Sequence, residues 1–310
     1  MKNFYRVMLG KRSAFADAAR KGNFIGADYG IDVDLSNQLP DTFRAFNEKF
    51  IPVWMKKNPG KSKISAGLSC GQLWVVAKGM QTGDVVLSPD GQGAYYVGEV
   101  AGGYSYSPGG PLPHRRAVQW LPGTIKRDEM SEGLRNSTGS IATVCEVTKH
   151  AAEIERLIGG KTPAVIVATD ETIEDVSVFA LEEHLEDFLV ENWPTTSLGQ
   201  QYNIFMEDGE AVGQQYPTDT GPIDILAVKK DGKELLVVEL KKGRASDVVV
   251  GQVQRYMGYV KDELLEEGQT VRGVIIALED DLKLRRALSV TTNIDFYTYK
   301  VSFQLMKSGA

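Results

Sequence analysis

Three charged side chains in the C-terminal half have the types and spacing that phosphodiester hydrolysis requires. Asp224 lies at the start of one apolar run, Glu239 lies at the end of the next, and Lys241 follows two residues later. Side chains two apart in a strand share a face, so Glu239 and Lys241 would lie side by side. The Asp231-Gly232 pair between the runs is a hairpin signal. An antiparallel hairpin would bring Asp224 and Glu239 together at one edge of a sheet.

Two carboxylates and an ammonium at one sheet edge are typical of a magnesium-dependent hydrolytic site. Mg²⁺ prefers a few oxygen ligands, which Asp224, Glu239 and the backbone carbonyl of Leu240 could provide, and Mn²⁺ could replace it. Lys241 could then orient the attacking water or stabilise charge on the phosphate oxygens. The alternative is a solvated strand end, where Glu239 and Lys241 form a surface pair worth under about 1 kcal/mol.

The elements that must position these residues alternate between helical and extended patterns. The apolar spacing predicts helices over 179–190, 246–265 and 280–288, and strands over 202–205, 223–228, 234–240, 271–278 and 294–306. The run 271–278 is apolar throughout, which suits the buried centre of a sheet. The C-terminal half is therefore expected to be an α/β or α+β domain.

The motif G-P-I-D-I-L-A followed by V-V-E-L-K resembles the core of PD-(D/E)XK nucleases, above all NucS-type endonucleases and Mrr-type restriction enzymes. The resemblance spans about residues 176–306 and implies a restriction-endonuclease-like αβ sandwich with a mixed central sheet. It also implies that the helix carrying L-E-E-H-L-E-D contributes a glutamate to the metal site. We favour Glu182 for this role, with Glu186 second.

Further residues after the catalytic strand fit the same family. Gln252 and Tyr256 resemble its Q-x-x-x-Y element, and at helical spacing they face the same way, so Gln252 could hydrogen-bond a phosphate or a metal-bound water. Three cations could follow a phosphate backbone, although ordinary surface charge is the alternative for each: Lys242, Arg244 and Arg255.

The N-terminal half has many short apolar runs broken by glycine and proline. We predict strands over 71–77, 83–88, 94–100 and 115–121, helices over 13–21 and 39–57, and a loop over 102–113. The segments C-G-Q-L-W, Y-V-G-E-V and P-H-R-R-A-V-Q-W resemble the PUA-like domains, related to EVE and SRA domains, that are fused to Mrr-type nucleases. This resemblance covers about residues 1–158 and implies a β-barrel.

The PUA-like resemblance implies a pocket that reads a flipped or modified base by stacking. The candidate aromatics are Tyr29, Trp74, Tyr95, Tyr104 and Tyr106, and the basic run that could touch a phosphate is His114, Arg115 and Arg116. The alternative is that the aromatics belong to the core. The sequence also departs from the family, because Ala27-Asp28 stands where a tryptophan is expected.

The composition limits the classes of protein to which the chain can belong. A chain of 310 residues with 42% hydrophobic and 25% charged residues is typical of a globular protein with two domains, here 1–158 and 176–310 with a linker over 159–175. No apolar run reaches the roughly 20 residues that cross a bilayer, and no signal-peptide pattern is present, so we expect no membrane contact and a cytoplasmic location. The net charge of −6 is unusual for a nucleic-acid-binding protein, although carboxylates that hold a cation contribute to it.

These patterns lead to three functional hypotheses. The first is a metal-dependent DNA endonuclease in host defence, of a modification-dependent or Mrr-like restriction kind. The second is a NucS-type repair nuclease that acts on mismatched or branched DNA. The third, from another class, is a non-catalytic DNA- or RNA-binding protein. DNA is the expected partner, and a break in both strands from one site per chain would favour a homodimer.

Overall fold

The computed structural model describes residues 2–140, 142–159, 185–207 and 209–299. The chain divides into two compact units, residues 1–172 with 207–212 and residues 173–206 with 213–310. In the described part, no helix has the length and apolar character needed to cross a membrane. Each unit has its own sheet and is described in turn.

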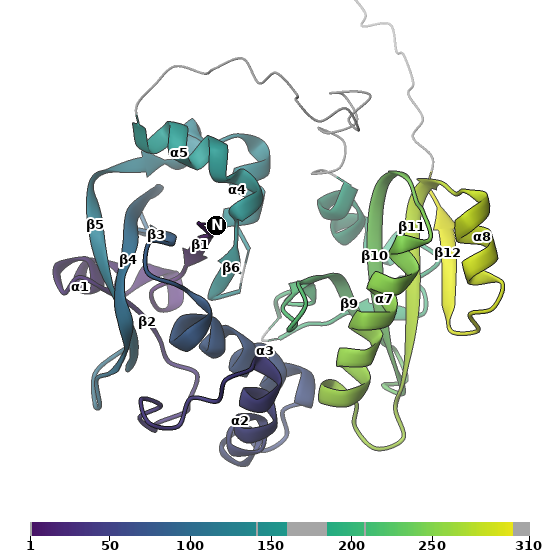
Figure 1. Ribbon diagram of the computed structural model, residues 1–310, viewed down its shortest axis with the longest axis horizontal. Helices are drawn as coiled ribbons and strands as arrows, with labels where there is room; N and C mark the ends of the chain where they lie inside the picture. The colour runs from purple at the N-terminus through teal and green to yellow at the C-terminus, as the bar shows by residue number, and fades with distance from the viewer. Residues whose placement is uncertain (1, 141, 160–184, 208, 300–310) are drawn as a thin grey trace, which may run out of the picture. The chain divides into compact units, whose positions relative to one another are not determined.

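The N-terminal unit is built on a mixed six-stranded sheet in the order β2-β5-β4-β3-β1-β6. Its strands are β1 (Phe4–Val7), β2 (Phe24–Ala27), β3 (Val85–Pro89), β4 (Ala94–Tyr106), β5 (His114–Lys126) and β6 (Val144–Glu146). Only the β1–β3 pair among the described ladders of this sheet is parallel. The long hairpin of β4 and β5 dominates the unit (Figure 1). The PUA-like barrel stays a prediction.

The helices of this unit are α1 (Ala16–Lys21), α2 (Phe43–Lys57), α3 (Lys63–Trp74) with a π-helical extension Val75–Gly79, α4 (Glu132–Thr138) and α5 (Ala151–Gly159). Two predictions for this unit are corrected by the structure. The predicted strand 71–77 is wrong, because α3 packs against α2 and this burial outweighs the strand preference of Val75 and Val76. Pro52 lies inside α2 without ending it. The predicted loop 102–113 is strand up to Tyr106.

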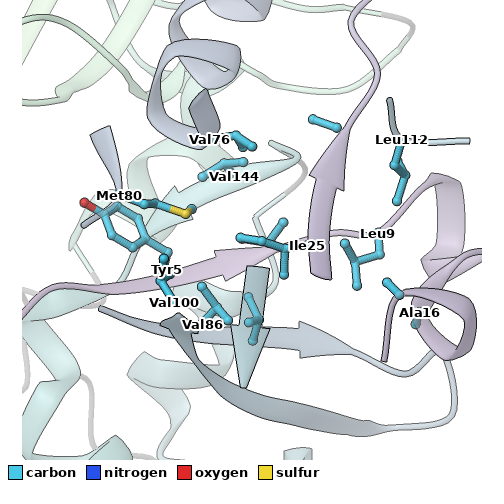
Figure 2. Close-up of a cluster of buried hydrophobic side chains, with 14 residues drawn as sticks. Tyr5, Leu9, Ala16, Ile25, Val76, Met80, Val86, Val100, Leu112 and Val144 are labelled. Atoms are coloured by element: carbon cyan, nitrogen blue, oxygen red, sulfur yellow. The ribbon is translucent and has the colours of Figure 1, made fainter. Parts of the chain in front are cut away.

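Three apolar clusters are buried in this unit, and two of them show how its sheet and its helices are held. The first joins β1, β2, β3 and β4 through residues that include Tyr5, Ile25 and Val86 (Figure 2). The second surrounds α2 and α3, where Phe46, Phe50 and Trp54, which recur at helical spacing on α2, are buried. Burial of a large apolar side chain contributes about 1.5–3 kcal/mol. The first cluster therefore stabilises the sheet, and the second stabilises the contact between α2 and α3.

The C-terminal unit contains the predicted mixed sheet, in the order β12-β11-β10-β9-β7 with β8 paired to β9. Its strands are β7 (Tyr202–Ile204), β8 (Gln214–Tyr216), β9 (Ile223–Lys229), β10 (Glu234–Arg244), β11 (Thr270–Glu279) and β12 (Ile294–Thr298). Strands β10, β11 and β12 are parallel, and β9 is antiparallel to β10.

Helices join the parallel strands of this unit, as parallel pairing requires. Helix α7 (Val248–Tyr259), with a π-helical extension Val260–Leu264, connects β10 to β11 and lies along both strands (Figure 1). Helix α8 (Leu282–Leu288) connects β11 to β12. A further helix, described over 185–192, precedes the short 3-10 turn Trp193–Thr195.

Candidate active site

The β9–β10 hairpin brings the three predicted catalytic side chains together. Its register pairs Ile225 with Val238, so Asp224 and Glu239 are the next facing positions. The Leu240 backbone N–H donates to Oδ2 of Asp224 at 2.8 Å. On the same face of β10, Nζ of Lys241 donates to Oε1 of Glu239 at 2.7 Å. The predicted hairpin is confirmed.

Glu239 is a buried carboxylate of which only one oxygen accepts a hydrogen bond from a described residue. Its side chain is only 2% exposed, and its Oε2 atom has no hydrogen-bond partner among the described residues. Burial, followed by the negative charge of Asp224, raises the pKa of Glu239 to about 7, although Lys241 opposes the shift. Two facing carboxylates and an unpartnered buried oxygen favour the binding of one more positive charge.

Two neighbouring glutamines, missed in the sequence, hold further carboxylates at this site. The β8–β9 register pairs Gln214 with Ile225 and Tyr216 with Ile223, so Gln215 lies opposite Asp224. Nε2 of Gln215 donates to Oε2 of Glu186 at 2.7 Å and to Oδ1 of Asp224 at 3.3 Å. Gln215 has a φ of +51°, which is uncommon for a residue other than glycine or asparagine. Gln215 therefore combines an uncommon backbone conformation with a side-chain amide that bonds both Glu186 and Asp224.

Gln214 extends the same arrangement to the helix over 185–192. Its Nε2 donates to Oε1 of Glu186 at 3.0 Å and to Oδ1 of Asp187 at 2.9 Å. Glu186, the second choice from sequence, is thus connected to Asp224 through Gln215, and Asp187 was not predicted. Glu182 lies outside the described residues. No spacing in the sequence signals either glutamine, because their contacts depend on the pairing of β8 with β9.

The predicted Q-x-x-x-Y pair lies on α7 near the carboxylates. Nε2 of Gln252 donates to the Tyr256 hydroxyl at 3.4 Å, and Tyr256 is 4% exposed. Burial raises the pKa of Tyr256, and the charges of Glu239 and Asp224 add to the shift. A β-carbon added at Gly221, where φ is +118°, would lie 3.2 Å from the Tyr256 hydroxyl. The positive φ and the nearby Tyr256 hydroxyl therefore both favour glycine at position 221, just before β9.

The predicted cations of this unit differ in their contacts. Arg255 is exposed on α7, and its charge lowers the pKa of Glu239. Nε of Arg244, also exposed, donates to the carbonyl of Asp280 at 3.3 Å. Lys242 belongs to β10, but its side chain lies outside the described residues. Within the described chain, no cluster of three or more His, Cys, Asp or Glu side chains has the geometry of a metal site.

The basic run predicted to touch phosphate in the N-terminal unit is largely interior. His114 is fully buried, with Nδ1 bonded to the Tyr104 hydroxyl at 2.9 Å and Nε2 to the Ile31 carbonyl at 2.6 Å. Arg116 is 6% exposed and donates to the carbonyls of Gly102 and Ala77. Neither side chain can reach a phosphate in solvent, so this prediction disagrees with the structure. Arg115 is half-buried, with its guanidinium 4.0 Å from the Phe24 ring centroid.

The aromatic candidates of this unit mainly serve its interior. Tyr29 donates to Oε1 of Gln72 at 2.7 Å, Tyr95 is 4% exposed, and Trp74 packs against the rings of Phe43 and Phe46. The rings of Tyr104 and Tyr106 both contact the buried His114. These contacts agree with core aromatics, the alternative to a base-reading pocket.

The two halves of the chain match two different family models. Residues 182–306 match the model of the Endonuclease NucS C-terminal domain. The C-terminal unit is therefore similar to the NucS C-terminal domain. The predicted resemblance to NucS-type nucleases is thereby confirmed for this part of the chain. Residues 5–148 match a domain of unknown function, DUF8426.

Individual relatives agree with the family match. Endonuclease NucS of Corynebacterium glutamicum (strain R) is 37% identical over 100 residues, which are 32% of this chain and 37% of the relative. Endonuclease NucS of Pyrococcus furiosus is 26% identical over 163 residues, which are 53% of this chain and 52% of the relative. The chain therefore spans only about two fifths to one half of the length of these relatives.

Two solved structures are similar at low identity. An EndoMS complex with double-stranded DNA gives a TM-score of 0.31 at 14% identity, covering 71% of this chain and 66% of the other. A repair endonuclease from Pyrococcus abyssi gives a TM-score of 0.30 at 16% identity, covering 66% of this chain and 78% of the other.

Proposed function

We propose that this protein is a DNA endonuclease of the NucS repair type, which cleaves mismatched or branched DNA. The observation that carries the proposal is the facing pair Asp224 and Glu239 with Lys241 beside them, inside a unit that matches the NucS C-terminal domain. The match to NucS favours the repair hypothesis over the Mrr-like restriction role that the sequence placed first.

A divalent cation fits this site, because Glu239 has an unpartnered buried oxygen and faces a second carboxylate. Asp224 and Glu239 would hold Mg²⁺ or Mn²⁺, and Leu240 remains a predicted carbonyl ligand. When bound, the cation would polarise the phosphodiester and lower the pKa of a water molecule. Few protein ligands suffice for Mg²⁺, which usually keeps several waters.

The remaining residues would bind and orient the DNA phosphate. Lys241 is part-exposed, so its ammonium could contact a phosphate oxygen while it keeps Glu239 in place. Charge that develops on that oxygen during cleavage would be stabilised by the ammonium more strongly than in the ground state. Arg255, exposed on α7, could contact a neighbouring phosphate.

The test compares Lys241→Met with Lys230→Met, which changes an exposed lysine in the β9–β10 turn. We expect Lys241→Met to lower cleavage of a mismatched or branched duplex by about 100-fold or more, while Lys230→Met cleaves normally. Equal cleavage by the two variants would remove Lys241 from the mechanism.

Substrate choice needs a second comparison, with paired, mismatched, branched, methylated and hydroxymethylated duplexes in Mg²⁺ or Mn²⁺. The repair proposal expects faster cleavage of mismatched or branched DNA than of any fully paired duplex. Preference for a methylated or hydroxymethylated duplex would instead support the restriction hypothesis.

A further inference from the structure

A hollow of about 590 Å³ lies in the N-terminal unit, where β4 begins and β5 ends. Its lining consists of the turn 92–94, the cations Lys126, Arg127 and Arg135, and one carboxylate, Asp128. We propose that this hollow binds a phosphate group of DNA. The choice of DNA as the source of the phosphate rests on the proposed function.

The strand pairing and one side-chain contact fix the hollow before any ligand binds. Ala94 pairs with Lys126 in the β4–β5 ladder, and the backbone N–H of Arg127 donates to the carbonyl of Gly93 at 2.9 Å. Nη1 of Arg127 donates to the hydroxyl of the buried Tyr95 at 3.0 Å. A guanidinium that is already held loses less conformational entropy when it binds an anion.

The cations of the hollow have no ion-pair partner among the described residues, although Asp128 lines the same hollow and Glu129 accepts a hydrogen bond from the Lys126 backbone N–H at 3.2 Å. Other lysines of this unit do form such pairs, as Lys57 does with Asp32 and Lys78 does with Asp41. Three unpaired cations beside one carboxylate create a positive region on a chain of net charge −6.

The chemistry of the lining suits an oxyanion such as phosphate. The planar fork of arginine matches two phosphate oxygens, and two half-buried arginines line this hollow. The volume lies in the range of about 300–1,000 Å³ that ligand pockets occupy. This site would take the phosphate-binding role that buried His114 and Arg116 cannot fill.

The test measures binding of the full chain to a short labelled DNA duplex over a range of salt concentrations, with EDTA present to prevent cleavage. The double variant Arg127→Gln/Arg135→Gln should bind more weakly, and its slope of log K against log salt should fall by about 1, since one phosphate contact is lost. A matched control, Lys21→Gln/Lys56→Gln, changes two exposed cations of the same unit outside the hollow and should keep the native slope.

A second arm separates the two sources of phosphate. Binding of free dAMP is measured with the same proteins, and loss of dAMP binding by the double variant with an unchanged DNA slope would mean that the hollow takes a free nucleotide. No change with either ligand, or no DNA binding by the native chain, overturns the proposal. Replacing Arg127 also removes its contact with the buried Tyr95, which contributes to folding. The single variant Arg135→Gln keeps that contact and should show about half of the decrease in slope.

Failure of this proposal is distinguishable from failure of the proposed function. Lys241→Met should lose cleavage, whereas Arg135→Gln should alter the slope even if no cleavage occurs in any variant.

Discussion

At the scale of single residues, the energetics of the site centre on the burial of Glu239. A buried carboxylate that faces another acid is costly when ionised, and its pKa is raised to about 7 by burial and by Asp224. A group with a raised folded-state pKa contributes stability that is present below its unfolded pKa and is lost as pH rises through its folded pKa. In the absence of metal, the folded protein should therefore lose stability between about pH 4.5 and 7.

The variant Glu239→Gln tests this pH dependence. Without metal at pH 8, the neutral amide should raise the free energy of unfolding by an amount on the order of 1–3 kcal/mol, and at pH 4 the gain should nearly vanish. Chemical denaturation of both proteins in EDTA across this pH range measures the difference. A gain that stays constant with pH would contradict the raised pKa.

Gln215 is expected to matter more for cleavage than its neighbour Gln214. The variant Gln215→Met removes the amide that bridges Glu186 and Asp224, and we expect about a 10-fold loss of activity, which is typical when a partner of a metal ligand is lost. Gln214→Met keeps the contact with Asp224 and serves as the matched control. Mn²⁺ affinity, measured by calorimetry, should fall in parallel for Gln215→Met only. Equal effects at the two positions would mean that the Asp224 contact is not decisive.

At the scale of elements, the position of α7 depends on a close approach to β11. A β-carbon added at Gly273 would lie 2.5 Å from Cγ1 of Val253 and 2.8 Å from Sδ of Met257, both on α7. A side chain larger than hydrogen fits there only if Val253 and Met257, or the helix that carries them, shift. Since α7 also carries Gln252 and Tyr256, this packing determines where the Q-x-x-x-Y pair lies relative to the carboxylates.

Two glycine substitutions test the contact between α7 and β11. Gly273→Ala should lower the free energy of unfolding by about 1–3 kcal/mol through overpacking, and cleavage should fall with the displaced helix. Gly258→Ala, within α7 but with no atom within 4 Å of the added β-carbon, should raise stability by up to about 1 kcal/mol. Urea denaturation measures both values, and a harmless Gly273→Ala would refute the tight contact.

At the scale of the whole molecule, the two units have separate sheets, so a ligand of one unit should stabilise that unit in particular. A cation that binds Asp224 and Glu239 only in the folded state should raise the stability of the C-terminal unit by about 2.7 kcal/mol at a concentration 100 times its Kd. Calorimetric melting of the full chain with and without Mn²⁺ measures this change. Asp224→Asn should abolish it, and an unchanged melting profile of the native chain would argue against the metal site.

The grouping of Asp224, Glu239 and Lys241 was predictable because it depends on local pairing. Asp224 and Glu239 are joined by a short hairpin whose turn is specified by Asp231-Gly232, and alternation along β10 places Lys241 beside Glu239. The long helix after the catalytic strand was likewise predictable from its apolar period.

Tertiary structure alone decided the features that join distant segments. Gln215 reaches Asp224 only through the β8–β9 register, and neither the spacing nor the type of this residue signals the contact. His114 and Arg116 have the composition of a phosphate-binding run, but packing around β5 buries them. The sequence by itself determined which residues can do chemistry and how the neighbouring strands pair. Burial and contacts between distant segments depend on how whole elements pack, which no local pattern specifies.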